Sequence, residues 1–360
     1  MLTDFDFFFS FWQGESFYNS RIPGVIDELD KMGIVTNSDG AKCIFTPLCK
    51  PAAEGGKGLP PLMVQKSDGG YGYDSTDVAA IKYRLKELDA DWLVYVTDLG
   101  QQTHFDSVFA AARMAGWDDK GAAKGKARLD HVGFGVVCGK DKKRFKTRSG
   151  TTVRLVDLLD EAVNRVQAVI QGRKADGKTE LDDAAIDDAA KAIGYGAVKY
   201  MDMRQDRVKN YVFSYERMLS LEGETAVYLS YAHARICSIQ RKAAAGAGHA
   251  DAAAYLAALR GGGAAVEITH KLERALLVKV LSFSNVVAGV MRKWQLNNLT
   301  KYLYELSTGL SEFYSAGKSD AALRVVGTPQ QDSRVLLLEL VATAIRTGLG
   351  LLGIRALRRL

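Results

Sequence analysis

The stretch DWLVYVTD, residues 91–98, decides how the first part of the chain is expected to fold. It is a short, nearly continuous apolar run, which predicts a strand buried on both faces. Apolar positions at helical spacing flank it at 78–88 and 105–115, and a second strand-like stretch, RLDHVGFGVV, follows at 128–137. Strands that alternate with helices in this way predict a doubly wound α/β fold, with a mostly parallel sheet and helices on its faces.

The sequence before this region predicts mixed strands and helices, and the sequence after it predicts mainly helices. Towards the N-terminus, helical spacing at 20–31 precedes two strand-like stretches, CIFTPL (43–48) and GLPPLMVQK (58–66). A helix is expected to begin near residue 152, and strand signals become rare after it. The remainder therefore predicts an all-α helical bundle.

Composition limits the class of protein. The chain has 360 residues, of which 47% are hydrophobic, and 48 Lys and Arg against 42 Asp and Glu give a net charge of +6. This balance permits a polyanionic partner without requiring one. The four cysteines, scattered without a CxxC pair, suggest neither a zinc site nor a disulfide framework and fit a reducing compartment. Glu339 and Arg346 interrupt the apolar C-terminal run, so we expect a buried helix there and no membrane association.

The stretch KSDGGYGYDSTDVAAIKYRL, residues 66–85, places Tyr73 and Asp77 four residues apart at the mouth of an expected helix. On one helical turn the two side chains project side by side. A carboxylate beside an aromatic ring suits a guanidinium, which is planar, permanently charged and binds acids through two hydrogen bonds. The alternative is structural, because Ser75, Thr76 or Asp77 could instead cap the helix.

Two polar residues, Gln101 and His104, follow the strand at 91–98 at the same expected edge of the sheet. Ligands bind at this edge in parallel α/β sheets. An isolated Gln and His in such a place more often have a structural role.

Basic residues crowd the loop GKDKKRFKTRSGTT at 139–152, between an expected strand and helix. Phosphate oxygens accept the hydrogen bonds that Lys, Arg and helix N-terminal amides donate, so the loop predicts a polyphosphate site. A solvated basic surface is the alternative. Gly133 and Gly135, just before the loop, would permit close approach of a flat ring or a phosphate, or would form a packing bulge.

Six stretches in order along the chain resemble arginyl-tRNA synthetases of the eukaryotic or plant-like type: ESFYNSRIPGVIDEL, SDGGYGYDSTDVAAI, HVGFGVV, FKTRSGTTVRLVDLLDEA, AIGYGAVKYMDMR and TAVYLSYAHARICSI. The resemblance runs from about residue 10 to the C-terminus. It implies an α/β Rossmann-like class I catalytic domain at 1–155, a stem-contact region at 156–222 and an all-α anticodon-binding bundle at 223–360. Its implied activity is that of an arginine-tRNA ligase, which joins arginine to tRNA-Arg through an arginyl-adenylate made with ATP and Mg²⁺.

The resemblance also implies roles for individual residues. The arginine side chain would be bound by Tyr73, Asp77 and Gln101. The basic loop is similar to the family's variant of the KMSKS signature, which implies that Lys143, Lys146, Thr147 and Arg148 bind the ATP phosphates. Gly133 and Gly135, in the HVGFGVV stretch that also resembles the family, are the other residues expected at ATP. The residues implied at the tRNA anticodon are Tyr228, Tyr231, Arg235 and Tyr314. The last residue is Leu360, where many members of the family end in methionine.

The chain departs from the family pattern at its front, because no His-x-Gly-His sequence (the HIGH signature) occurs in it. We therefore expect it to correspond to the C-terminal part of a synthetase, without the N-terminal domain and the HIGH half, and to be inactive or nearly so alone. A non-catalytic tRNA-binding module derived from the synthetase is the alternative function. We expect a cytoplasmic monomer, with an organellar location as the alternative.

Overall fold

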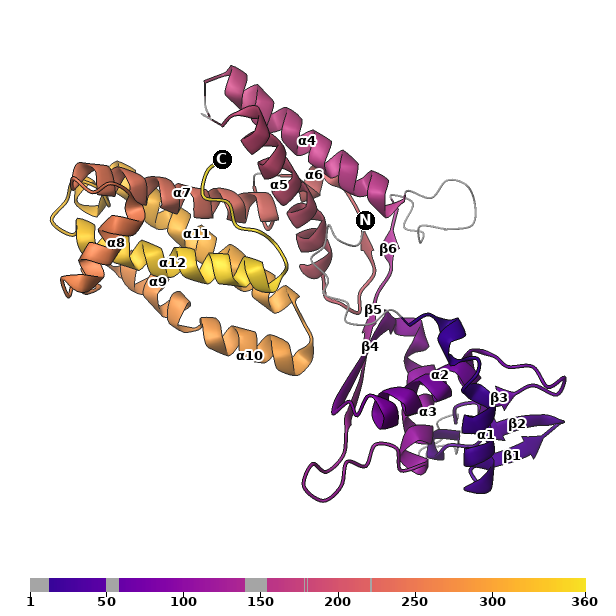
Figure 1. Cartoon of the computed structure of the whole chain (residues 1–360). Coiled ribbons are helices and arrows are strands. Elements are labelled where there is room, and N and C mark those ends of the chain that lie inside the picture. The colour runs from indigo at the N-terminus through magenta and orange to yellow at the C-terminus, as the bar shows by residue number, and fades with distance from the viewer. Residues whose placement is uncertain (1–12, 50–57, 140–153, 178, 180, 221) are drawn as a thin grey trace. The chain divides into compact units, whose positions relative to one another are not determined.

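The computed structural model describes residues 13–49, 58–139, 154–177, 179, 181–220 and 222–360. They fall into two compact units that divide between Val136 and Val137 (Figure 1). We call the described residues up to Val136 the α/β unit and those from Val137 onward the helical unit, and treat each by itself.

The α/β unit contains a three-stranded antiparallel sheet and a two-stranded parallel sheet. Its elements are η2 (Glu15–Tyr18), α1 (Ile22–Lys31), β1 (Val35–Ser38), β2 (Ala41–Ile44), η3 (Pro47–Cys49), β3 (Leu62–Gln65), α2 (Tyr73–Lys82), η4 (Tyr83–Glu87), β4 (Trp92–Asp98), η5 (Leu99–Gln101), α3 (Gln102–Met114) and β5 (Arg128–Phe134). Strands β4 and β5 pair in parallel from Trp92 opposite Arg128 to Asp98 opposite Phe134, with α3 as their crossover. This unit of strand, helix and strand confirms the predicted α/β class.

The predicted parallel pairing is found between β4 and β5, whereas β1, β2 and β3 are antiparallel. The reason lies in the turn between β1 and β2. Asp39 and Gly40 both have positive φ, +49° and +78°, which is the backbone of a two-residue hairpin turn. An Asp-Gly pair adopts this conformation readily, and it reverses the chain at once.

The prediction that β4 is buried on both faces was wrong. Leu93 and Tyr95 point into the core, whereas Trp92, Val94 and Val96 on the other face are 38–63% exposed. Successive side chains of a strand alternate between its faces, and in the described part of the α/β unit only one face of β4 is covered. Both faces of β4 therefore carry apolar side chains, but only one face is buried.

Helix α2 begins earlier than the apolar spacing suggested, and this places the residues of interest within it. Gly72 is the N-cap, and the Ser75 hydroxyl accepts the Gly72 N–H at 3.1 Å while donating to the Val64 carbonyl at 2.7 Å. Ser75 thus fastens the first turn of α2 to β3. Asp77 lies a full turn inside the helix, so the alternative that Asp77 caps it was wrong.

The helical unit is mainly helical, as predicted, apart from one parallel pair of two-residue strands. Its elements are β6 (Val137–Cys138), α4 (Leu155–Ala175), α5 (Asp183–Met203), β7 (Tyr211–Val212), α6 (Tyr215–Met218), α7 (Ala226–Gly246), α8 (Ala252–Gly261), α9 (Lys271–Leu281), α10 (Phe283–Lys293), α11 (Asn297–Ser319), η6 (Ala321–Leu323) and α12 (Gln331–Leu351). Helix α12 carries the apolar C-terminal run, and its residues Val335, Leu338, Val341 and Ile345 are fully buried, as expected. A smaller apolar cluster joins α4 to α5.

One segment of the helical unit, Lys271–Lys293, is long and apolar enough to cross a membrane by length and composition, although only 11% of its most apolar window is buried. It comprises α9 and α10, which meet at Ser282. Leu281 and Met291 are among its exposed side chains. Length and composition do not separate a membrane span from paired helices of a water-soluble domain.

Candidate functional site

Four side chains meet at the start of α2 and α3 in the α/β unit. Tyr73 and Asp77 lie one turn apart on α2, as predicted. His104, in the first turn of α3, contacts Asp77 through its Nε2, 2.7 Å from Oδ2, and Asp74 through its Nδ1, 3.3 Å from Oδ1. The Tyr73 ring lies edge-on to the imidazole with centroids 5.0 Å apart. We call Asp74, His104 and Asp77 the imidazole–carboxylate cluster.

The charges of this cluster compensate one another inside a partly closed site. Burial acts to lower the pKa of His104, but hydrogen bonds and charge from Asp74 and Asp77 outweigh it and raise the pKa to about 9. At neutral pH the imidazole is therefore a cation that donates to both carboxylates. The Asp77 side chain is 29% exposed and Tyr73 is 72% exposed, so both are accessible to a ligand.

Gln101, the third residue expected to contact arginine, ends η5 just before α3 and is exposed. It lies three residues before His104 in the chain. Among the described residues no hydrogen bond joins Gln101 to Tyr73 or Asp77. Its contribution to an arginine site stays a prediction.

The residues expected at ATP are placed only in part. Gly133 lies on β5, where an added Cβ would come within 2.9 Å of the Leu99 Cα and 3.0 Å of the His131 ring, so the chain itself occupies the space beside it. This close packing favours the structural alternative for Gly133. Gly135 follows β5 and is half-buried. The other candidates, Lys143, Lys146, Thr147 and Arg148, lie outside the described residues.

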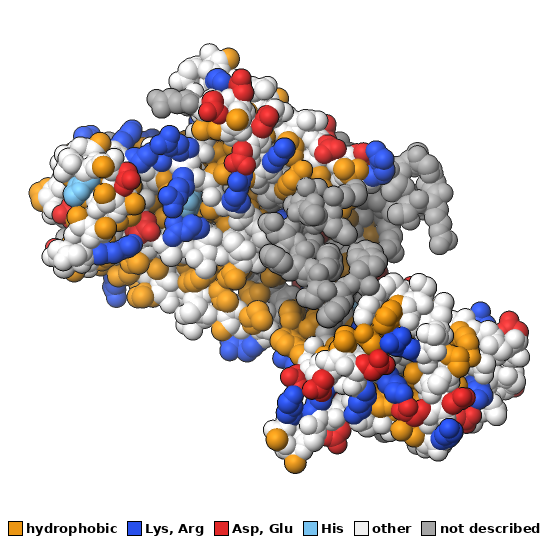
Figure 2. Space-filling model, in the orientation of Figure 1, with side chains coloured by type: hydrophobic (Ala, Val, Ile, Leu, Met, Phe, Trp, Pro, Cys, Tyr) orange, Lys and Arg blue, Asp and Glu red, His pale blue; other side chains and the backbone are white. Residues whose placement is uncertain are grey.

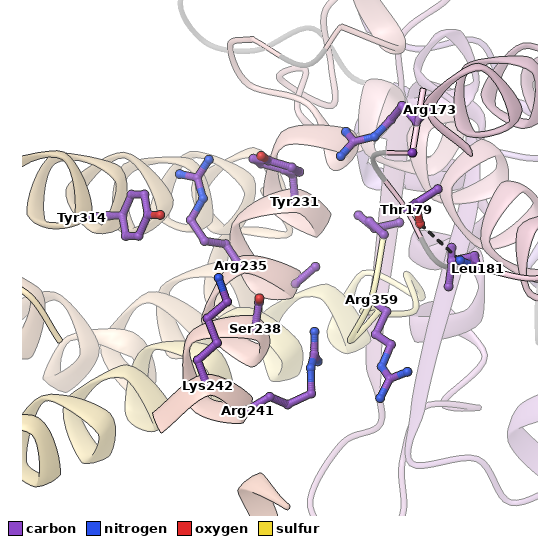
Figure 3. Close-up of a pocket in the computed structure, with 13 residues that line it drawn as sticks. Arg173, Thr179, Leu181, Tyr231, Arg235, Ser238, Arg241, Lys242, Tyr314 and Arg359 are labelled. Atoms are coloured by element: carbon purple, nitrogen blue, oxygen red, sulfur yellow. Dashed lines mark hydrogen bonds between the residues drawn. The ribbon is translucent and has the colours of Figure 1, made fainter. Parts of the chain in front are cut away.

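A basic cavity of about 620 Å³ lies in the helical unit, between the middle of α7, the end of α4 and the C-terminal segment, residues 352–360 (Figure 3). Its cationic lining comes from elements far apart in the sequence: Arg173 on α4, Arg235, Arg241 and Lys242 on α7, and Arg359 near the C-terminus. Figure 2 shows Lys and Arg gathered on this face of the helical unit. We call this space the basic cavity.

Two tyrosines flank the central cation of the basic cavity. The Arg235 guanidinium carbon lies 4.7 Å from the Tyr231 ring centroid and 4.9 Å from that of Tyr314, and Figure 3 shows its side chain between them. A hydrogen bond with Arg235, opposed by burial, lowers the pKa of the Tyr231 hydroxyl. Three of the four residues expected at the anticodon therefore meet in one place.

The fourth, Tyr228, faces a different neighbour. Its hydroxyl lies 3.0 Å from the Ser311 Oγ, and its ring packs beside Tyr304, both on α11. Tyr228 is absent from the lining of the basic cavity. One helical turn on α7 thus separates a tyrosine that holds the bundle together from one that faces the cavity.

The C-terminal segment closes one side of the basic cavity. The His233 Nδ1 lies 2.8 Å from the Leu357 carbonyl, and Arg241 donates to the Arg358 carbonyl at 3.1 Å. These bonds hold the segment against α7, so that Arg359 and Leu360 line the cavity. Leu360 also lines an adjoining, mainly apolar cavity of about 400 Å³ that shares Arg173 and Tyr231.

Several residues of both sites were missed from the sequence. Ser238 and Lys242 continue the spacing of Tyr231 and Arg235 along α7, and extending that pattern would have found them. Arg173 and Arg359 are brought to the cavity only by the packing of α4 and the C-terminal segment, and no local pattern marks them. His104 was noticed but interpreted as structural.

Comparison with known families identifies the chain. The family described as tRNA synthetases class I (R), catalytic domain, matches residues 2–215, and the DALR anticodon binding domain matches residues 229–360. The chain therefore belongs to the arginine (R) family of class I tRNA synthetases. The catalytic-domain match covers the α/β unit and extends through α4 and α5 of the helical unit, whereas the anticodon-domain match begins within α7 and contains most of the residues that line the basic cavity.

Individual relatives agree with the family. The chain is 44% identical over 350 residues to cytoplasmic arginine-tRNA ligase of Arabidopsis thaliana, covering 97% of this chain and 54% of that protein. It is 42% identical over 351 residues to arginine-tRNA ligase of Nostoc sp., covering 97% and 56%. Arginyl-tRNA synthetase from Plasmodium falciparum matches the fold with a TM-score of 0.77 at 30% identity, over 99% of this chain and 55% of that one. The chain thus spans about half the length of the relatives it matches.

Proposed function

We propose that this chain serves as an arginine-tRNA ligase, binding arginine through the α/β unit and tRNA-Arg through the helical unit. The observation that carries the choice of amino acid is the placement of Tyr73 and Asp77 on one turn of α2, in a chain 44% identical to an arginine-tRNA ligase. The proposed division is a catalytic part at 1–155, a stem-contact region at 156–222 and an anticodon-binding part at 223–360.

Asp77 is the proposed partner of the arginine guanidinium. Its carboxylate is partly exposed, and the Tyr73 ring beside it offers a flat surface on which a guanidinium can stack. A lysine ammonium has no planar group to stack and cannot form the paired hydrogen bonds that a guanidinium forms with a carboxylate. The geometry therefore favours arginine over lysine. Gln101 is the proposed additional contact.

The basic cavity is the proposed site for the anticodon. Arg173, Arg235, Lys242 and Arg359 make no ion pair with a described carboxylate, so their charges are available to phosphates. Unpaired bases are read by stacking on aromatic and guanidinium planes, which Tyr231, Arg235 and Tyr314 present. Tyr228 supports the site from behind by fastening α7 to α11.

ATP is the proposed co-substrate, accompanied by Mg²⁺. The described residues contain no group of three or more His, Cys, Asp or Glu that could hold a metal ion. In this proposal Mg²⁺ is held mainly by the ATP phosphates, as it is in many nucleotide sites. Lys143, Lys146, Thr147 and Arg148 are the proposed phosphate contacts, with Gly135 near the base.

The test measures binding and charging in parallel. The purified chain is mixed with labelled arginine, ATP, Mg²⁺ and a tRNA-Arg transcript, and charging is followed by acid precipitation. Filter binding compares the same transcript with one carrying a lysine anticodon, and calorimetry compares arginine with lysine. Preference for arginine and for tRNA-Arg supports the proposal, and equal binding of both amino acids and both transcripts contradicts it.

A non-catalytic tRNA-binding module is the second candidate function. It is favoured by the basic cavity, which is formed entirely from described residues of the helical unit. Binding of tRNA-Arg without any charging would support this function, whereas charging would exclude it.

We place the protein in the cytoplasm as a monomer. The named relatives include a cytoplasmic arginine-tRNA ligase and a chloroplastic/mitochondrial one, so the organellar location is the alternative. Fractionation of cells that express a tagged chain distinguishes the compartments and reports any membrane fraction. Light scattering with size-exclusion chromatography measures the oligomeric state.

A further inference from the structure

The imidazole–carboxylate cluster contains a cation in the place where the proposed arginine guanidinium would bind. The His104 Nε2 lies 2.7 Å from the Asp77 Oδ2, so one oxygen of the proposed arginine partner is already engaged. A guanidinium that binds a carboxylate through two hydrogen bonds needs both oxygens. Arginine and His104 therefore compete for Asp77.

The other side of the imidazole is fixed by the protein. The Asp74 Oδ1 lies 3.3 Å from the His104 Nδ1, and the Asp74 Oδ2 accepts the Met63 N–H of β3 at 2.8 Å. Asp74 is 13% exposed and fixed to the backbone of a neighbouring strand, so its contact with Nδ1 persists when the contact on the Nε2 side changes. This arrangement assigns the permanent proton to Nδ1 and leaves Nε2 as the nitrogen that can change partner.

We propose that His104 is a positioning residue that couples arginine binding to the release of one proton. Without arginine, the doubly protonated imidazole holds Asp77. When the guanidinium takes the Asp77 carboxylate, Nε2 gives its proton to solvent, and its lone pair then accepts an N–H from the guanidinium. Asp74 keeps the Nδ1–H throughout. This inference rests on the proposed arginine site and adds a residue and a pH dependence to it.

The surroundings of His104 support this exchange. Among the described residues, the titratable groups that face it are Asp74 and Asp77 on α2, with the Tyr73 phenol beside the ring. On the β5 side, Phe105 lies against both His104 and His131. A guanidinium at Asp77 removes one of the two carboxylates from the imidazole and adds a like charge next to it. Both changes disfavour the imidazolium.

The experiment measures the proton directly. Calorimetry of arginine binding in phosphate and in Tris, buffers of different ionisation enthalpy, gives the number of protons released. The same titration with 4-guanidinobutyrate, which carries the guanidinium but no α-amine, removes the contribution of the arginine amine. We expect release that approaches one proton at pH 7, and a Kd for both ligands that falls about tenfold per pH unit between pH 7 and pH 9.

Two variants and one spectroscopic measurement separate this role from a merely structural one. His104→Gln should bind 4-guanidinobutyrate without proton release and with a flat pH profile, whereas the control Asp106→Asn on the same helix should behave as wild type. In the wild-type chain, long-range ¹H–¹⁵N spectra should show His104 doubly protonated without ligand and singly protonated, at Nδ1, with ligand at pH 7.

The outcomes distinguish this inference from the proposed function. Ligand binding with no proton release, or equal release in His104→Gln, would overturn the role of His104 and leave the arginine site standing. Absence of any arginine binding by the wild-type chain would overturn both. The spectra are recorded on the wild-type chain, so they test the protonation change of His104 even if the glutamine variant does not fold.

Discussion

The two candidate sites handle charge in opposite ways. In the imidazole–carboxylate cluster of the α/β unit, two carboxylates already have a cationic partner, His104, at 2.7 and 3.3 Å. In the basic cavity of the helical unit, Arg173, Arg235, Lys242 and Arg359 have no partner carboxylate among the described residues, and Arg235 lies between two tyrosine rings.

Because of this difference, the ligand affinities of the two sites should depend on different solution conditions. A site that is neutralised internally must exchange one cation for another, so its affinity should depend on pH through the resident imidazole. A site with unpaired cations attracts a polyanion and releases the counter-ions of that polyanion, so its affinity should depend on salt. Arginine binding and tRNA binding are therefore expected to respond to different variables.

The largest expected effect is on stability, and it concerns a cation of the helical unit that already has a carboxylate partner in the folded protein. Arg334 and Glu273 form a buried ion pair with side chains only 3% and 1% exposed. Arg334→Met should lower the free energy of unfolding by about 3–5 kcal/mol, because it leaves Glu273 buried without its partner. Arg346→Met, at an exposed site on the same helix, should cost less than about 1 kcal/mol. Equal urea midpoints for the two variants would show that neutralisation in this unit does not matter for stability.

The second effect concerns the carboxylate of the arginine site. Asp77→Asn removes the charge but keeps the shape, and it should weaken arginine binding about 100-fold, or ~3 kcal/mol. Binding of tRNA-Arg should not change. The measurement is calorimetry with arginine and filter binding with tRNA, and Asp106→Asn is the matched control. An unchanged arginine affinity would remove Asp77 from the site.

The third effect is the pH dependence of stability that His104 confers. The pKa of His104 is raised to about 9 in the folded protein, from 6.5 for the free side chain. Its stabilisation is therefore complete below about pH 6.5 and is lost as pH rises through about 9, a change on the order of 1–3 kcal/mol. The stability difference between wild type and His104→Gln should shrink between pH 6.5 and pH 9.5. Calorimetric melting at both pH values tests this, and a constant difference would contradict it.

The smallest effect concerns the central cation of the basic cavity. Arg235→Gln should weaken tRNA-Arg binding about tenfold and make log Kd less steep in log salt by about one unit, because one phosphate contact and one stacking surface are lost. Arg292→Gln removes the same charge from an exposed position on α10 and serves as the control. If both variants lose the same affinity, net charge rather than the cavity determines binding.

The sequence predicted the fold class, the order of a strand-and-helix region before a helical region, and three of the residues that line the basic cavity. The places of Tyr231 and Arg235 came from the resemblance to the family, and their spacing along one helix is consistent with a shared face. Tyr314 came from the resemblance to the family. The roles of Gly133 at ATP and of Tyr228 at the anticodon stay predictions, because a glycine on a strand and a tyrosine on a helix look the same in a sequence whether they face a ligand or a neighbouring element.

The remaining features depend on contacts between distant parts of the chain. Asp74 and His104 are thirty residues apart, and only the packing of α3 against α2 makes them partners. Arg359 reaches the cavity because His233 and Arg241 hold the C-terminal segment against α7. The exposed face of β4 was missed because an apolar run indicates composition and does not show which neighbours are present.

The most direct test of this account is a reciprocal titration of one set of proteins with both ligands. Wild type, Asp77→Asn and Arg235→Gln are each titrated with arginine and with tRNA-Arg at fixed pH and salt. We predict that Asp77→Asn weakens the binding of arginine but not that of tRNA-Arg, and that Arg235→Gln weakens the binding of tRNA-Arg but not that of arginine. If both variants weaken the binding of the same ligand, or if neither variant weakens the binding of either ligand, the assignment of two separate sites is contradicted.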